Sequence, residues 1–215
     1  RKMHGATKEH CLKNAIDVFG VDNITVIGDR LNDETRRNVE LLGVRLVLVN
    51  NGNGAGTFRD ALDIAIKEND DDTMVYLLED DFLHLPQSSN KLVEVLERYD
   101  CYATLYDHPD KYIDASSGGN PFIEGGGEDT KLFKTPSSHW KITNSTVMSF
   151  AARVNRLKQD YDSLMKHSDG QITDSFKFFC ELRSTKGIPV VSSIPGYSTH
   201  CETAWLSPLT NWEKV

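Results

Sequence analysis

The stretch that decides the fold is Thr73-Met74-Val75-Tyr76-Leu77-Leu78-Glu79-Asp80-Asp81, in which an apolar run passes directly into three acidic residues. Residues 73–78 are apolar enough for a strand that is buried on both faces, as in the middle of a parallel sheet. Acidic side chains are rarely buried without partners, so Glu79, Asp80 and Asp81 mark the point where this strand leaves the core. The stretch therefore predicts a central strand with a polar site at its carboxyl end.

Helix-like and strand-like segments alternate on both sides of this strand. Strand patterns occur at 23–29, 44–49, 103–106, 131–134, 142–148 and 188–193. Helical spacing of apolar residues occurs at 7–19, 34–42, 57–69, 92–99, 150–164 and 174–182. Alternation with short connections is typical of an α/β domain. We therefore predict a single α/β domain in which helices flank a central, mainly parallel mixed sheet.

Length and charge restrict the kind of protein further. The chain has 215 residues, of which 39% are hydrophobic and 26% are charged, and a chain of this size builds one main core. Lys and Arg total 24 against 32 Asp and Glu, which gives a net charge of −8. Such a field repels nucleic acid and anionic membranes, so we expect no nucleic-acid partner. A phosphate-bearing ligand must then be held by a local site.

The cysteines and the apolar runs indicate the compartment. Neither Cys-x-x-Cys spacing nor the cysteine density of a secreted scaffold is present, which favours reduced thiols. No run reaches the ~18 to 20 apolar residues of a membrane span, and the first residues lack the apolar stretch of a signal peptide. We therefore expect a cytoplasmic protein without a transmembrane segment.

The acidic residues at the strand end suit a divalent cation. Ligands of open α/β sheets bind outside the carboxyl ends of the strands, where Glu79, Asp80 and Asp81 are expected to lie. Mg²⁺ and Mn²⁺ commonly take one or two carboxylates together with substrate phosphates. The structural alternative is an acidic turn that pairs with Lys or Arg. The stretch favours contacts to a metal or to a ribose.

The order of these motifs resembles the nucleotide-sugar glycosyltransferases of the GT-A fold. In that family a central strand ends in an Asp-x-Asp-type motif, which stands here as Glu79-Asp80-Asp81, with Glu in place of the first Asp. A strand that ends at Asp29, and another followed by a glycine-containing turn and Thr57-Phe58-Arg59, precede it in the same order. The resemblance implies a Rossmann-like GT-A domain, with a nucleotide-sugar half to about residue 85 and an acceptor half from about residue 86.

The resemblance also implies roles for individual residues. Asp29 would lie near the nucleotide base and Arg59 near the donor diphosphate, and Asp81 would bind the metal with Glu79 and Asp80 beside it. Many enzymes of this family take a late histidine as a second manganese ligand, a role that falls here on His200. A lone histidine is otherwise a surface or core residue. The implied cofactor is Mn²⁺ or Mg²⁺, and the implied donor is a UDP-sugar.

Three further segments are similar to the small glycosyltransferase domain of chlorella-virus capsid-glycan enzymes. They are Tyr-Asp-His-Pro-Asp-Lys-Tyr at 106–112, Ser-His-Trp-Lys at 138–141 and Pro-Gly-Tyr-Ser-Thr-His at 195–200. This likeness implies a viral protein that transfers a hexose, from UDP-glucose or a related donor, to a glycan or glycoprotein. The sequence departs from the family at its start, because GT-A domains begin with a strand that these residues do not show.

The expected chemistry is stabilisation of a leaving group. Departure of a nucleoside diphosphate builds negative charge, which a cation at Asp81 and the guanidinium of Arg59 would offset. An inverting enzyme also needs a carboxylate base to take the acceptor proton. Asp174 is the candidate, because it begins a late helix; a role as the helix N-cap fits the same position.

Four residues are candidates for contacts to a sugar. Trp140 offers an apolar face for a pyranose ring, or is a core tryptophan. His139 and Asn144 flank it in the same segment, and Asp107 either binds sugar hydroxyls or belongs to a turn.

Two other functions compete with glycosyl transfer. A nucleotidyltransferase on a related scaffold would use the same carboxylate-bound metal, but typically needs a glycine-rich loop and a basic residue on its first strand. A non-catalytic module would bind the nucleotide sugar without turning it over.

Overall fold

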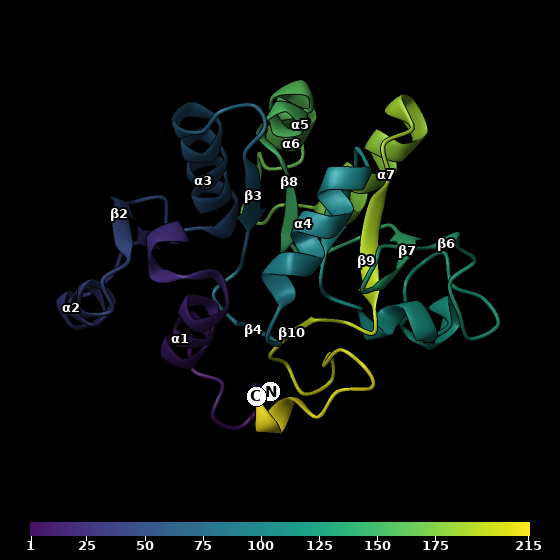
Figure 1. The fold of residues 1–215 in the computed structure, drawn as a ribbon, viewed down its shortest axis with the longest axis horizontal. Coiled ribbons are helices and arrows are strands. Elements are labelled where there is room, and N and C mark those ends of the chain that lie inside the picture. The colour runs from purple at the N-terminus through teal and green to yellow at the C-terminus, as the bar shows by residue number, and fades with distance from the viewer.

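A six-stranded mixed sheet forms the centre of the computed structural model, which describes all 215 residues (Figure 1). Its strand order is β3 (Met74–Leu77), β8 (Phe150–Arg153), β5 (Tyr102–Thr104), β9 (Val190–Ile194), β7 (His139–Thr143) and β6 (Leu132–Lys134). β5 and β9 pair in parallel, whereas β8 is antiparallel to both of its neighbours, and so is β7. It follows that β3, β5, β9 and β6 share one direction, so the predicted mixed α/β sheet is confirmed.

Two small sheets flank this one and hold the segments that carry the candidate site. β1 (Thr25–Asp29) pairs in parallel with β2 (Arg45–Val49), so that Asp29 lies beside Val49. β4 (Phe82–His84) pairs with β10 (Ser198–His200) in the antiparallel sense, and His200 faces Phe82. The second pairing lays the C-terminal tail against the residues that follow β3.

Four of the helices begin at side chains that cap them. Side chains of Thr7, Asn32, Asn53 and Asp174 accept hydrogen bonds from first-turn amides of four of them, which stabilises helix starts. The helices are α1 (Lys8–Phe19), α2 (Asp33–Leu41), α3 (Gly54–Glu68), α4 (Ser88–Arg98), α5 (Val154–Gln159), α6 (Tyr161–Lys166) and α7 (Ser175–Lys186). Short 3₁₀ turns lie at Val21–Asn23, Pro109–Tyr112, Ala115–Ser117 and Trp212–Lys214.

Apolar clusters cover both faces of the large sheet. One cluster joins helices α3, α6 and α7 to the sheet, through residues such as Leu62, Leu164, Phe178, Phe179 and Tyr102. The other packs α4 against β5, β7 and β9, with Trp140 inside it. A third, smaller cluster joins the two ends of the chain, which lie together (Figure 1), and consists of Met3, Cys11, Leu83, Cys201 and Trp212.

Two predicted elements differ from the structure. The helix expected at 150–164 begins instead with β8, because residues 150–152 are buried between two other strands, where an extended backbone completes the sheet. The strand expected at 142–148 lies at 139–143. It cannot continue, because Val147 and Met148 have positive φ angles of 48° and 55°, a region closed to strand residues.

None of the helices has the length and apolar character that crossing a membrane requires.

Candidate functional site

Asp81 and His200 meet just beyond the carboxyl end of β3. The His200 Nε2 atom lies 2.9 Å from Asp81 Oδ2, although the two residues are 119 positions apart in the chain. The β4–β10 pairing creates this contact, and the amide of Cys201 donates to the Asp81 carbonyl over 2.9 Å. The ammonium group of Lys2 also contacts Asp81 Oδ2. The other oxygen, Oδ1, is buried and has no hydrogen-bond partner.

Asp81 is a carboxylate throughout the neutral range. Burial alone would raise its pKa, but the hydrogen bonds from His200 and Lys2 outweigh burial and lower the pKa to about 2. A buried carboxylate oxygen without a partner, beside an imidazole, is a donor set that Mn²⁺ or Mg²⁺ accepts. The chain has no group of three or more Asp, Glu, His or Cys placed to hold an ion. A cation at this pair would therefore draw further ligands from a substrate or from water.

Glu79 and Asp80 lie beside this pair in different surroundings. Asp80 is exposed and pairs with Lys8 over 2.5 Å, as expected for an acidic turn. The Glu79 amide donates to Ser149 Oγ over 3.2 Å. Desolvation of its carboxyl group and the charges of Asp81 and Asp80 raise the pKa of Glu79.

Asp29 shapes the loop at the start of α3. Its carboxylate accepts hydrogen bonds from the Asn51 amide (2.8 Å), the Gly52 amide (2.7 Å) and the Thr57 hydroxyl (3.3 Å). Gly52 has a φ of 71°, a left-handed conformation that favours glycine. Asp29 thus holds the glycine-containing turn in place, and its contact with a nucleotide base stays a prediction.

Arg59 and Asp174 have opposite surroundings. Arg59 is half-buried on α3, and no hydrogen bond or ion pair ties its guanidinium to the rest of the chain. Asp174 accepts from the Lys177 amide (3.0 Å) and pairs with the Lys177 ammonium (2.9 Å). Burial would raise the pKa of Asp174, but these contacts lower it overall. The N-cap that the sequence allowed for Asp174 is present, and a role as base stays a prediction.

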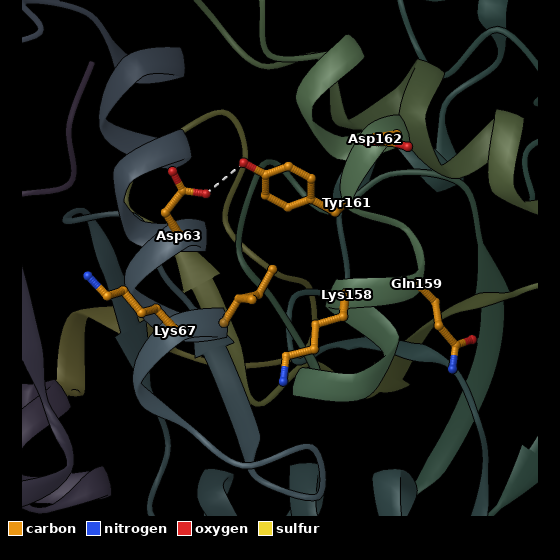
Figure 2. Close-up of a pocket in the computed structure, with 7 residues that line it drawn as sticks. Asp63, Lys67, Lys158, Gln159, Tyr161 and Asp162 are labelled. Carbon is orange, nitrogen blue, oxygen red and sulfur yellow. Dashed lines mark hydrogen bonds between the residues drawn. The ribbon is translucent and has the colours of Figure 1, made fainter.

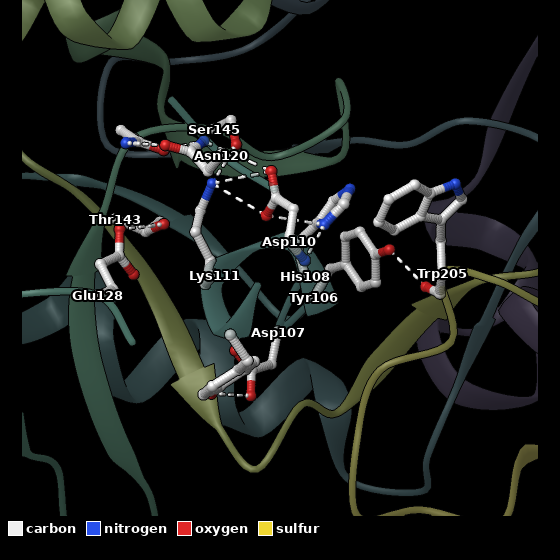
Figure 3. A network of polar contacts seen from close by, with 12 residues as sticks. Tyr106, Asp107, His108, Asp110, Lys111, Asn120, Glu128, Thr143, Ser145 and Trp205 are labelled. Atoms are coloured by element: carbon white, nitrogen blue, oxygen red, sulfur yellow. Dashed lines mark hydrogen bonds and ion pairs between the residues drawn. The ribbon is translucent and has the colours of Figure 1, made fainter. Parts of the chain in front are cut away.

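A second polar network lies under the loop that follows β5 (Figure 3). The buried ammonium of Lys141 lies 2.9 Å from Asp107 Oδ1 and 3.4 Å from Glu128 Oε2. The buried ammonium of Lys111 lies 3.2 Å from Asp110 Oδ1 and 2.8 Å from Ser145 Oγ. These contacts fix the segment 107–128 against β7 and the residues after it.

Burial perturbs the titration of this network. Burial lowers the pKa of Lys111 and raises the pKa of Glu128. Burial would also lower the pKa of Lys141, but the attraction of Asp107 outweighs it, so the pKa of Lys141 is raised. The ion pair with Asp107 therefore keeps Lys141 charged.

The predicted sugar contacts are distributed over this region. The structure corrects the prediction for Trp140, which is fully buried and donates from Nε1 to Thr135 Oγ1 (3.2 Å), so neither face of its ring is open to a sugar. Asp107 is 1% exposed and held by Lys141. Asn144 exchanges amide hydrogen bonds with Asn120, both over 3.0 Å. His139 is exposed at the start of β7.

No local pattern indicates Lys2, because its contact with Asp81 depends on how the chain ends fold together. Lys141 and Lys111 were also missed. A lysine inside the strand-like run His-Trp-Lys-Ile-Thr was a usable signal for Lys141, since a charge at an inward position of a strand needs a buried partner.

A hollow of the surface lies away from all of these residues (Figure 2). It has a volume of about 550 Å³ and lies between the later turns of α3 and the helices α5 and α6. Across it, the Tyr161 hydroxyl donates to Asp63 Oδ1 over 2.8 Å. Asp29 and the turn that it holds lie at the opposite, N-terminal end of α3, so this hollow is separate from the candidate site.

Comparison with known proteins identifies the fold. The chain is similar to the structure of CMP:2-keto-3-deoxy-manno-octonic acid synthetase complexed with CTP, with a TM-score of 0.50 and 16% identity over 91% of this chain and 84% of that one. It is also similar to 4-diphosphocytidyl-2C-methyl-D-erythritol synthase, with a TM-score of 0.47 and 13% identity over 96% of this chain and 85% of that one. No family model matches the chain, and no curated protein sequence matches it either. The likeness to the synthetase shows a Rossmann-like α/β fold of the GT-A kind.

Proposed function

We propose that this chain is a metal-dependent transferase that moves a hexose from a UDP-sugar, UDP-glucose or a related donor, to a glycan or glycoprotein. The observation that carries the proposal is the contact between Asp81 and His200, which joins the end of the central strand to the C-terminal tail. The unpartnered oxygen of Asp81 gives this pair a free ligand position. A viral source rests on the sequence resemblance alone.

Four side chains have proposed roles in this reaction. Asp81 and His200 would hold Mn²⁺ or Mg²⁺, which when bound supplies positive charge to the departing nucleoside diphosphate. Arg59 has no partner within the chain, so its paired N–H donors are free for a diphosphate. Asp174 would serve as the base of an inverting reaction once it releases the Lys177 ammonium.

Nucleotidyl transfer is the second candidate, and the comparison with solved structures favours it over glycosyl transfer. The likeness to a synthetase crystallised with CTP supports it, because that protein shares the fold over most of both chains. A carboxylate-held cation would serve this chemistry equally well, since it also has a phosphate leaving group. The two reactions differ in their products: glycosyl transfer releases a nucleoside diphosphate, and nucleotidyl transfer releases pyrophosphate.

The first test measures binding and products together. UDP-glucose, UDP and CTP are titrated calorimetrically with and without MnCl₂, and the incubated samples are analysed for UDP and for pyrophosphate. We expect UDP-glucose to bind only with metal and to release UDP slowly. Pyrophosphate release from CTP with an added sugar acid would favour nucleotidyl transfer. Binding without any product would favour a non-catalytic module that binds the nucleotide sugar.

The matched variants are Asp81→Asn and Asp80→Asn, which remove neighbouring carboxylates of the same turn. Asp81→Asn should abolish metal-dependent binding and UDP release, whereas Asp80→Asn should retain both, because Asp80 is exposed and pairs with Lys8. Full turnover by Asp81→Asn would exclude the proposed metal site.

A further inference from the structure

Two buried thiols lie in contact beside the candidate site. Cys11 Sγ in α1 and Cys201 Sγ after β10 are 3.9 Å apart, although the two residues are 190 positions apart in the chain. Cys11 is 3% exposed and Cys201 is fully buried, and both belong to the small cluster that joins the chain ends. Cys101 is buried in another cluster, and Cys180 lies on α7. Cys11 and Cys201 are therefore the pair placed to react with each other.

Cys201 is tied directly to the candidate metal ligands. It follows His200 in the chain, and its amide donates to the Asp81 carbonyl over 2.9 Å. Its own carbonyl accepts from the Met3 amide over 2.8 Å. A movement of Cys201 toward α1 would consequently act on His200 and Asp81 together.

We propose that Cys11 and Cys201 form a thiol–disulfide exchange site, at which a small disulfide of the glutathione class converts the pair to an intramolecular disulfide. One cysteine thiolate attacks the small disulfide, which forms a mixed disulfide and releases one small thiol. The second cysteine then attacks the sulfur of the first and releases the second small thiol. The protein loses two electrons and two protons, and the small disulfide gains them.

The burial of both sulfurs sets the conditions for the reaction. The reagent reaches them when the segment after β10 opens transiently from α1, so exchange is slower than at an exposed thiol. Closing the bond moves the sulfurs together by roughly 2 Å. Because Cys201 is the neighbour of His200, we expect this movement to alter the His200–Asp81 contact and to weaken Mn²⁺ binding. That last expectation rests on the proposed function.

The test oxidises the intact protein with glutathione disulfide and maps the bond by mass spectrometry without reduction. We expect a mass loss of about 2 Da, a linked peptide pair that contains residues 11 and 201, and two remaining free thiols out of the four cysteines. A crosslink between such distant positions should raise the thermal midpoint by on the order of 10 °C. Cys180→Ser should behave like the wild type. Cys11→Ala should show neither the linked peptide pair nor the rise of the thermal midpoint.

The outcomes separate the two proposals. Glutathione adducts without a linked pair, or four free thiols after oxidation, would overturn the exchange site, and the wild-type mapping decides this even if Cys11→Ala does not fold. If the linked protein binds Mn²⁺ as tightly as the reduced protein, the coupling to His200 is excluded. If the reduced protein binds no Mn²⁺, the proposed metal site fails while the disulfide result stands.

Discussion

His84 is a fully buried histidine whose ring has few partners. Its Nε2 atom lies 3.2 Å from the Tyr76 hydroxyl, and its Nδ1 atom is buried without a hydrogen bond. Its backbone is held by Asn14, which donates to the His84 carbonyl over 3.0 Å and accepts from its amide over 2.7 Å. Burial lowers the pKa of His84 to about 3, so the native ring is neutral.

This buried ring makes stability depend on pH. Below pH 6.5, its ordinary pKa, His84 takes up a proton in the unfolded protein. In the native protein its ring stays neutral down to about pH 3. The free energy of unfolding should therefore fall as pH falls below 6.5, by at most about 1.4 kcal/mol per pH unit from this residue. Urea unfolding at pH 7, 6 and 5 should show that the free energy of unfolding changes less with pH for His84→Gln than for the wild type. The exposed His4→Gln is the control, and an equal slope in both variants would mean that other groups carry the effect.

At the residue scale, position along a strand predicted more than residue type did. The place of Asp81 was predicted from an apolar run that ends in acidic residues. The family resemblance predicted that His200 lies beside it as a second metal ligand. Lys2 and Lys141 escaped prediction because each pairs with an acid distant in the chain. Lys111 pairs with its neighbour Asp110, and its burial depends on how the following loop folds. The role of Trp140 depended on burial, which spacing alone leaves open.

β7 carries a buried charge in its middle, and its removal should be costly. Lys141→Met would leave Asp107 and Glu128 buried without their common cation. Breaking a buried pair from one side typically costs about 3–5 kcal/mol. Urea unfolding should show this loss for Lys141→Met and almost none for Lys134→Met, whose side chain is exposed on β6. A loss below about 1 kcal/mol would mean that the carboxyl groups protonate or reach water instead.

The start of α7 separates a structural from a chemical role of Asp174. Asp174→Ala removes the cap and should lower stability by about 1 kcal/mol, whereas Asp174→Asn keeps a capping oxygen and should change it little. If Asp174 is also the base, both variants should lose roughly 100-fold or more in turnover. Unfolding curves and UDP release measured on the same samples distinguish the roles. Full activity in Asp174→Asn would leave Asp174 as a cap alone.

Elements were predicted well where local signals agreed. The helical spacing of apolar residues at 7–19 and 34–42 placed the ends of α1 and α2 within one residue. The error at 150–164 arose because a short buried strand and a buried helical turn have the same apolar composition. Only its two sheet neighbours, β3 and β5, make residues 150–153 extended.

At the scale of the whole molecule, the sequence indicated the α/β class but not which strands become neighbours. β8 lies between β3 and β5, and β9 lies between β5 and β7. These insertions depend on pairing between segments far apart in the chain, which local patterns do not encode. The same long-range pairing brings β10 to β4, and the candidate site depends on it.

The closure of the chain ends should therefore support both stability and the site. Trp212 is 1% exposed, packs in the cluster with Met3 and Cys11, and donates from Nε1 to the Ser207 carbonyl over 2.8 Å. Trp212→Ala should lower the free energy of unfolding by about 3–5 kcal/mol. It should also weaken Mn²⁺-dependent UDP-glucose binding, because the loosened tail carries His200. Urea unfolding and calorimetry test both effects, with the exposed Glu213→Ala as control; a stability loss with unchanged binding would show that the β4–β10 pairing holds His200 without the cluster.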